Sequence, residues 1–95
     1  MTGSLARAAR LAQIGVGAIV DDAIRAGELP GRMRLPVQLY LLVNGCNLPG
    51  ATVASIAGCT RQNVSKHIAR VEDLRDQPSF ERVLTSIETR LFGER

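Results

Sequence analysis

Tryptophan is absent from this sequence, aromatic residues number only three, and the two cysteines form no CxxC pair. With a single histidine in addition, the chain offers no cluster of metal ligands, and we expect neither a metal nor another cofactor. Two unclustered thiols are typical of half-buried cysteines in a reducing cytoplasm. The sequence also contains no P-loop, nucleophile–base pair or pair of acids at a useful spacing, so it predicts neither an enzyme nor a small-molecule substrate.

Long apolar runs are missing as well. No segment approaches the roughly 18–20 apolar residues that a membrane helix requires, so we expect no membrane partner. The 95 residues, 45% of them hydrophobic and 22% charged, are typical of one soluble, folded domain with an aliphatic core. The Arg- and Ala-containing N-terminus is similar to a presequence, but it lacks a compact apolar core and a cleavage site. We therefore interpret it as an ordinary helix of a cytoplasmic protein.

Apolar residues at helical spacing predict an all-α fold of about five helices. The first extends from Leu5 to about Ala26, with apolar residues every three or four positions: Leu5, Ala8, Ala12, Val16, Ile19 and Ala23. Gly15 and Gly17 weaken this helix and indicate close helix–helix contact or a local bend. Residues 27–36 contain two prolines and two glycines and are predicted as a loop. The apolar segment 37–43 is predicted as a short helix ended by Asn44-Gly45.

Three further helices are predicted after this segment. Asn47 and Pro49 indicate the start of a helix that ends at Gly58, a residue suited to the position after a helix. Thr60 is expected to cap the next helix, which runs to about Arg75. After a break around Pro78, residues 79–92 form the last helix, with a set of apolar residues expected to be buried: Phe80, Val83, Leu84, Ile87 and Leu91.

The two helices joined at Gly58-Cys59 have the spacing of a helix-turn-helix motif. Ala54 lies four residues before Gly58, where the helices cross and a larger side chain would collide. Gly58 takes the turn position, which favours a positive φ. The second helix is expected to be held against the first by Ala57, Val64 and Ile68. A generic αα-corner in a small helical bundle is the alternative interpretation.

The face of the 60–75 helix opposite Val64 is expected to be exposed, and it has no acid before Glu72. At about 100° per residue, the outward positions are Gln62, Lys66, Ala69 and Asp73, flanked by Arg61, Ser65, Asn63 and Arg70. A solvated face with no binding role would normally mix charges of both signs. Gln and Asn pair bidentately with adenine, and Arg or Lys with guanine, when the N-terminal part of a helix enters the major groove. The pattern therefore predicts a helix that binds double-stranded DNA.

Positive charge is concentrated in the middle of the chain. The net charge is +3, and residues 29–71 hold five basic residues and no acid. Such a distribution is expected of a surface that meets phosphate, although an apolar composition can also leave a stretch without acids. We expect Arg61, Gln62, Asn63 and Lys66 to read bases, and a second group to contact the DNA backbone: Thr60, Ser65, Arg70, Arg32 and Arg34. His67 is interpreted as a packing residue or a further phosphate contact.

Three segments carry a family resemblance: the basic loop leading into QLYLLV, the pair Leu48-Pro49, and VSKHIARVEDLRDQPSFERVLTSIETRL. From Leu35 onward they resemble the C-terminal DNA-binding domain (domain IV) of the bacterial replication initiator DnaA. The resemblance implies a helix-turn-helix fold of the DnaA domain IV or Trp repressor type. It divides the chain into an N-terminal helix at 1–28, for packing or partner binding, and a DNA-binding domain at 29–95.

One departure from that family concerns the turn. Its hallmark there is Gly-Gly-Arg-Asp-His-Thr-Thr, whereas residues 58–63 of this chain read GCTRQN and are one residue shorter. We therefore expect a different DNA site. Small stand-alone regulators similar to those of gene transfer agent or prophage loci are the nearest functional analogues. The expected function is that of a sequence-specific, double-stranded DNA-binding transcriptional regulator, an activator, in the bacterial nucleoid.

Two alternatives involve other activities. In the first, the helix at 5–26 is the working surface of a protein adaptor that binds RNA polymerase, a sigma-like protein or the replication initiator. In the second, the chain controls replication by competing for origin sites, an idea that the altered turn disfavours.

Overall fold

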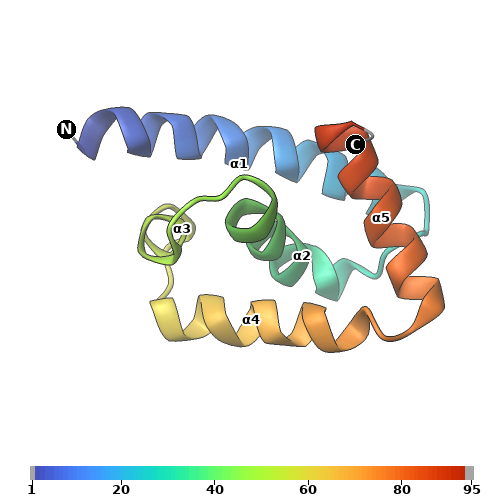
Figure 1. The fold of residues 1–95 in the computed structure, drawn as a ribbon. Coiled ribbons are helices and arrows are strands. Elements are labelled where there is room, and N and C mark those ends of the chain that lie inside the picture. Colours follow the sequence, from blue (N-terminus) through green and yellow to red (C-terminus); the bar gives the residue numbers. More distant parts are fainter. Residues whose placement is uncertain (1, 94–95) are drawn as a thin grey trace.

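The computed structural model describes the backbone of residues 2–93 and the side chains of residues 4–93. Within that range it contains no strand and five α-helices: α1 (Thr2–Arg25), α2 (Arg34–Tyr40), α3 (Gly50–Ala57), α4 (Arg61–Leu74) and α5 (Pro78–Phe92). The predicted all-α fold is therefore confirmed. Figure 1 shows α1 and α4 along opposite edges of the molecule, with α2 between them and α3 and α5 near the two ends.

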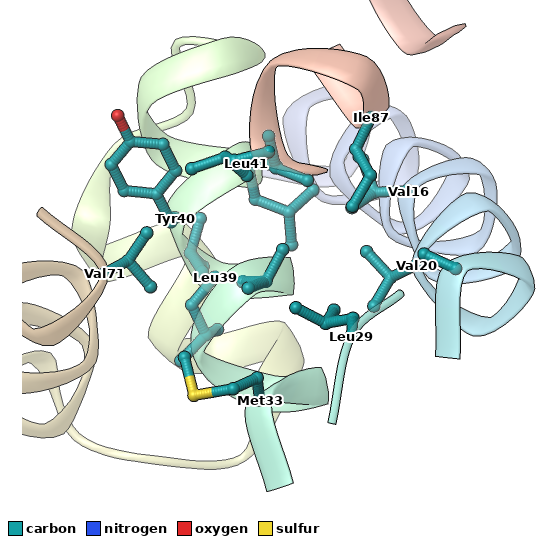
Figure 2. Packing of buried hydrophobic residues seen from close by; sticks show 14 of the residues in the cluster. Val16, Val20, Leu29, Met33, Leu39, Tyr40, Leu41, Val71 and Ile87 are labelled. Atoms are coloured by element: carbon teal, nitrogen blue, oxygen red, sulfur yellow. The ribbon is translucent and has the colours of Figure 1, made fainter. Parts of the chain in front are cut away.

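The centre of the core is α2 and the turn that follows it. Val37, Leu39, Leu41 and Leu42 are all fully buried, because residues 37–43 are apolar at every position except Gln38 and so offer almost no polar surface to solvent. In Figure 2, Leu39 and Leu41 lie between Val71 of α4 on one side and Val16 and Val20 of α1 and Ile87 of α5 on the other. The core is aliphatic, as predicted, and Tyr40 is its one buried aromatic residue in the described part of the chain.

The side of α1 that faces the core differs in part from the predicted apolar stripe. Ala9, Val16, Val20 and Ala23 are buried, whereas Leu5 and Ala8 are exposed. Gly17 makes the predicted close contact, since an added Cβ would lie 3.1 Å from Nε2 of Gln38 on α2. The same Nε2 donates a hydrogen bond to the carbonyl oxygen of Gln13 (3.3 Å), which ties α2 to α1.

The prediction of a loop over residues 27–36 was wrong at its C-terminal end. Arg34 begins α2, and Gly31–Met33 forms a 3₁₀ turn before it. Pro36 then occupies the first turn of α2, where a missing backbone N–H costs nothing because the first amides of a helix have no partner. Met33 and Leu29 are buried and fix this segment on the core.

The predicted end of the second helical segment at Asn44-Gly45 is confirmed, although its last turn is not α-helical. The chain continues from Tyr40 into a π-helical turn, Leu41–Gly45. Gly45 is needed there because an added Cβ would lie 2.5 Å from the ring of Phe92 on α5. The glycine at the end of this segment therefore also permits a close approach between the turn and α5.

The segment from α3 to α4 follows the prediction closely. α3 ends at Gly58, whose φ of +73° is the left-handed conformation that favours glycine. The Thr60 hydroxyl oxygen accepts a hydrogen bond from the backbone N–H of Asn63 (3.1 Å) and so caps α4. Ala54 and Val64 are buried at the junction, Ala57 and Ile68 are half-buried, and Val71 is buried farther along α4.

α5 completes the core at the other end of the molecule. Leu84 and Ile87 are buried as predicted, while Phe80, Val83 and Leu91 are only partly covered. Cys46 and Cys59 are free and half-buried, and burial raises the pKa of the Cys46 thiol. None of the helices in the described range has the length and hydrophobicity to cross a membrane.

Candidate nucleic-acid interface

The orientation of α4 follows from its two buried valines. Because Val64 and Val71 face the core, the opposite side of the helix is turned to solvent. All six residues that were predicted to bind DNA from this helix are exposed: Arg61, Gln62, Asn63, Ser65, Lys66 and Arg70. Their exposure is confirmed, as is the intermediate burial of His67 at the edge of the core-facing side. α1 lies at the opposite edge of the molecule and leaves this face open (Figure 1).

The N-terminus of α4 is held in a fixed geometry by its cap. Thr60 satisfies the amide of Asn63, and its hydroxyl hydrogen remains available as a donor on the exposed surface. The positive end of the helix dipole lies at this terminus, beside the side chains of Arg61 and Gln62. Arg61, Gln62, Ser65 and Lys66 together line a shallow hollow on the outer surface. This end of α4 is therefore suited to a negatively charged partner.

The cations on α4 are not neutralised by neighbouring acids. The described part of the chain has five salt bridges, and all of them are formed by other residues. Arg61, Lys66 and Arg70 take part in none of them. The first exposed acids along the helix are Glu72 and Asp73, in its last turn. The exposed side chains of the first three turns therefore include positive charges and polar groups but no acid.

Arg32 is brought to the same side of the molecule as Arg70. Both line a cleft of about 290 Å³ between the 3₁₀ turn, the C-terminal half of α4 and the start of α5. The floor is apolar, with Met33, Leu74 and Phe80, and Glu28 is the one acid on its wall. A loop residue that is distant in the sequence thus joins the surface of α4.

Arg34 has different surroundings. Its Nε donates to Oδ1 of Asp21 (2.6 Å) and its Nη2 donates to Oδ2 (3.3 Å), so the guanidinium joins α2 to α1. The hydrogen bond from Arg34 lowers the pKa of Asp21, in spite of some desolvation. The predicted phosphate contact of Arg34 stays a prediction, and the structure gives this side chain a partner within the fold.

Sequence reasoning missed a polar cluster around Arg75, at the C-terminal end of α4. Nε and Nη2 of Arg75 donate to the two carboxylate oxygens of Glu81 (2.5 and 3.0 Å), and Nη1 donates to Glu88 (3.2 Å) and to the Tyr40 hydroxyl (2.8 Å). These bonds raise the pKa of Arg75 and lower that of Glu81. The only sequence signal was the spacing of seven between Glu81 and Glu88, which places both acids on one face of α5.

The Arg75 cluster matters to the surface of α4 because it fixes that helix at its end. Arg75 binds the carboxylates of Glu81 and Glu88 on α5 and the hydroxyl of Tyr40 on α2. These bonds fix the direction of α4 relative to α2 and α5. Together with the Thr60 cap, it makes α4 a rigid support for its exposed side chains.

No family model, no curated protein and no solved structure matches this chain. The resemblance to DnaA domain IV and the DNA-binding role of the residues above therefore stay predictions.

Proposed function

We propose that this protein binds double-stranded DNA in a sequence-specific manner through α4 and acts as a transcriptional regulator. The observation that supports the proposal is the outer face of α4, where six exposed polar or basic side chains between residues 61 and 70 are accompanied by no acid and no ion pair. A face of this kind repels no phosphate and leaves its hydrogen-bond donors free for base edges.

The dimensions of α4 also support docking in a major groove. Residues 61–70 extend over roughly 14 Å at 1.5 Å per residue, which is similar to the groove width of about 12 Å. Gln62 and Lys66 lie one turn apart at the centre of the exposed face, where they would meet base edges. Thr60 at one end, and Arg70 with Arg32 at the other, would then contact phosphates on the two walls of the groove.

Selection from a random pool of duplexes, followed by affinity measurements, tests this proposal. Replacement of Lys66 or Gln62 by Ala is expected to weaken binding to the selected site by about 1–3 kcal/mol and to relax its sequence preference. Arg82→Ala is the matched control, because Arg82 is an exposed cation on α5 that lines neither the hollow beside Lys66 nor the cleft beside Arg70. Its loss should change affinity far less.

Two results would contradict the proposal. The first is a full-length protein without duplex affinity at low salt. The second is an Arg82→Ala variant that loses as much affinity as Lys66→Ala, since binding would then depend on net charge and not on the face of α4.

A further inference from the structure

A cavity of about 630 Å³ lies between α5 and the π-helical turn that follows α2, and no residue of α4 lines it. Its volume is within the range of small-molecule sites, about 300–1,000 Å³. Among the described residues no Lys, Arg or His lines it, although the chain has 12 Lys and Arg residues. The lining provides one carboxylate, three hydroxyls, one amide and one aromatic ring: Glu88, Tyr40, Thr85, Thr89, Asn44 and Phe92.

The negative charge of Glu88 is only partly neutralised within the fold. Its carboxylate oxygens each lie 3.2 Å from a nitrogen of Arg75, but the same guanidinium also binds both oxygens of Glu81. Among the described residues neither acid has another salt bridge. One guanidinium therefore serves two carboxylates, and the cluster keeps an excess of one negative charge. The Glu88 side chain is 32% exposed and lines the cavity, so a second cation can reach it there.

The oxygen atoms of the lining are mainly hydrogen-bond acceptors. An ionised Glu88 can only accept, and the Thr85 hydroxyl donates its one hydrogen to Glu81 (3.3 Å), so its oxygen can only accept as well. The Tyr40 hydroxyl accepts from Arg75 and has a second lone pair; Figure 2 shows it directed away from the core. An ammonium group has three donors and no acceptor, so it complements these oxygens.

Two helical segments end at the cavity. The π-helical turn that continues α2 ends at Gly45, and α5 ends at Phe92 and is followed by Gly93; all three residues line the cavity. The C-terminal end of a helix carries unpaired carbonyl groups and the negative end of the helix dipole, which favour a cation and disfavour an anion. The two helix ends therefore add to the negative charge beside Glu88.

From this lining we infer that the cavity binds an aliphatic primary amine, with the ammonium group beside Glu88 and the alkyl chain against the ring of Phe92. The excess negative charge, the acceptor oxygens and the two helix ends all select a cation, and the aromatic ring provides apolar contact and a cation–π interaction. A bare metal ion fits less well, because the described residues contain no group of three His, Cys, Asp or Glu side chains that could hold one.

The single tyrosine of the chain provides a probe at the site itself. Tyr40 lines the cavity, and because the chain has no tryptophan, tyrosine fluorescence comes from this residue alone. Titration of the full chain, without DNA, with n-butylammonium chloride at constant ionic strength should change that fluorescence in a saturable way. A Kd on the order of 1 mM is expected for a ligand with so few atoms. n-Butanol has the same alkyl chain without the charge and should produce no saturable change.

Amide chemical shifts in NMR spectra of the labelled protein locate the bound amine. The largest changes on addition of n-butylammonium should occur at Gly45, Thr89 and Gly93, which come from the two segments that border the cavity. The amides of Gln62 and Ser65, on the outer face of α4, should not shift, because these residues line a different hollow.

A matched pair of variants tests whether the cavity is the cation site. Thr89 and Ser86 are both exposed on α5, but only Thr89 lines the cavity. Thr89→Lys places a tethered ammonium group at the site and should weaken n-butylammonium binding by about tenfold or more. Ser86→Lys adds the same charge elsewhere on the helix and should leave the Kd unchanged. Since the two variants have equal net charge, their difference reports on the cavity.

A second pair of variants tests the role of the carboxylate. Glu88→Gln and Glu81→Gln each remove one acid from Arg75, but only Glu88 lines the cavity. Glu88→Gln should weaken n-butylammonium binding by about tenfold, and Glu81→Gln should weaken it less, because the carboxylate at the site is retained. Circular dichroism establishes that both variants are folded.

The ammonium group can belong to a free amine or to a lysine side chain of a peptide. Nα-acetyl-lysine methylamide carries the same butylammonium group as the free probe, attached to a peptide backbone. Weaker binding than that of n-butylammonium would identify a free amine as the ligand, and tighter binding would identify a peptide. Both results agree with an ammonium site.

Three results would overturn the inference: no saturable change in either fluorescence or chemical shifts, n-butanol binding as tightly as n-butylammonium, or equal Kd values for Thr89→Lys and Ser86→Lys. Because no DNA is present in these experiments, none of the results bears on the DNA-binding proposal. A chain without duplex affinity would likewise leave the amine site in place.

Discussion

Arg70 and Arg75 lie on neighbouring turns at the end of α4, and their surroundings are opposite. Arg75 is 23% exposed and donates hydrogen bonds to Glu81, Glu88 and Tyr40. Arg70 is exposed on the wall of the cleft that it shares with Arg32, and it belongs to no ion pair of the described residues. The same residue type thus serves to fix the fold in one place and offers an uncompensated charge in the other.

The same contrast separates Arg34 from Arg32, two residues apart in the chain. Arg34 is held by Asp21 across the α1–α2 contact, whereas Arg32 lies beside the surface of α4. A positive charge that already has a carboxylate partner gains little from a phosphate, because the first partner would have to be given up. Basic residues therefore divide by their surroundings, and under the proposed function we expect the uncompensated group to make the stronger contacts with DNA.

Arg75→Ala should have the largest effect on stability. It removes the hydrogen bonds that join α4 to α2 and α5 and leaves two acids close together, so we expect a loss of about 2–3 kcal/mol in the free energy of unfolding. Urea unfolding followed by circular dichroism measures it. Arg70→Ala should change stability by no more than about 0.5 kcal/mol, as for an ordinary surface residue. Equal effects of the two replacements would remove the distinction between them.

Arg70→Ala should instead act on DNA binding. We expect a loss of about 1 kcal/mol on every duplex, with the salt dependence of binding shallower by about one charge, because a phosphate contact carries no sequence information. Arg34→Ala is the matched control, since it removes the same charge from a residue that Asp21 already neutralises. Fluorescence anisotropy at several salt concentrations distinguishes them. If Arg34→Ala produces the larger loss, Arg34 exchanges Asp21 for phosphate on binding.

The smallest effect is expected in the pH dependence of stability. The pKa of Glu81 is lowered by Arg75, so the contribution of this pair is present above the unfolded pKa of Glu, about 4.3. It is lost as the pH falls through the lower folded value. The melting temperature should therefore fall as the pH is reduced from about 5 to about 3, and less steeply in Glu81→Gln.

Asp21 contributes to the same acid-induced loss, because Arg34 also lowers its pKa. Asp76→Asn is a suitable control, since Asp76 is exposed and belongs to no ion pair of the described residues. It should keep the pH dependence of the wild-type protein. A Glu81→Gln variant that does the same would show that the bond to Arg75 does not stabilise the folded chain.

Several local features of the fold and of the candidate site were predictable from the sequence. The cap at Thr60, the positive φ of Gly58 and the exposed face opposite Val64 all depend on neighbours within one or two turns. The errors have a different origin. Pro36 was predicted as part of a loop because the local pattern did not show that Met33, just before α2, is buried in the core. The close approach of Gly45 to Phe92 was not visible in that pattern either.

The sequence by itself determined the all-helical fold, the phase of α4 and the absence of acids from its outer face, because helix periodicity and capping act over a few residues. Only the tertiary structure decided which arginines have carboxylate partners, that Arg32 joins the surface of α4, and that Leu11 and Ile14 stay uncovered. Those outcomes depend on where helices distant in the sequence cross, since a charge or an apolar side chain acquires its surroundings only when the chain is packed.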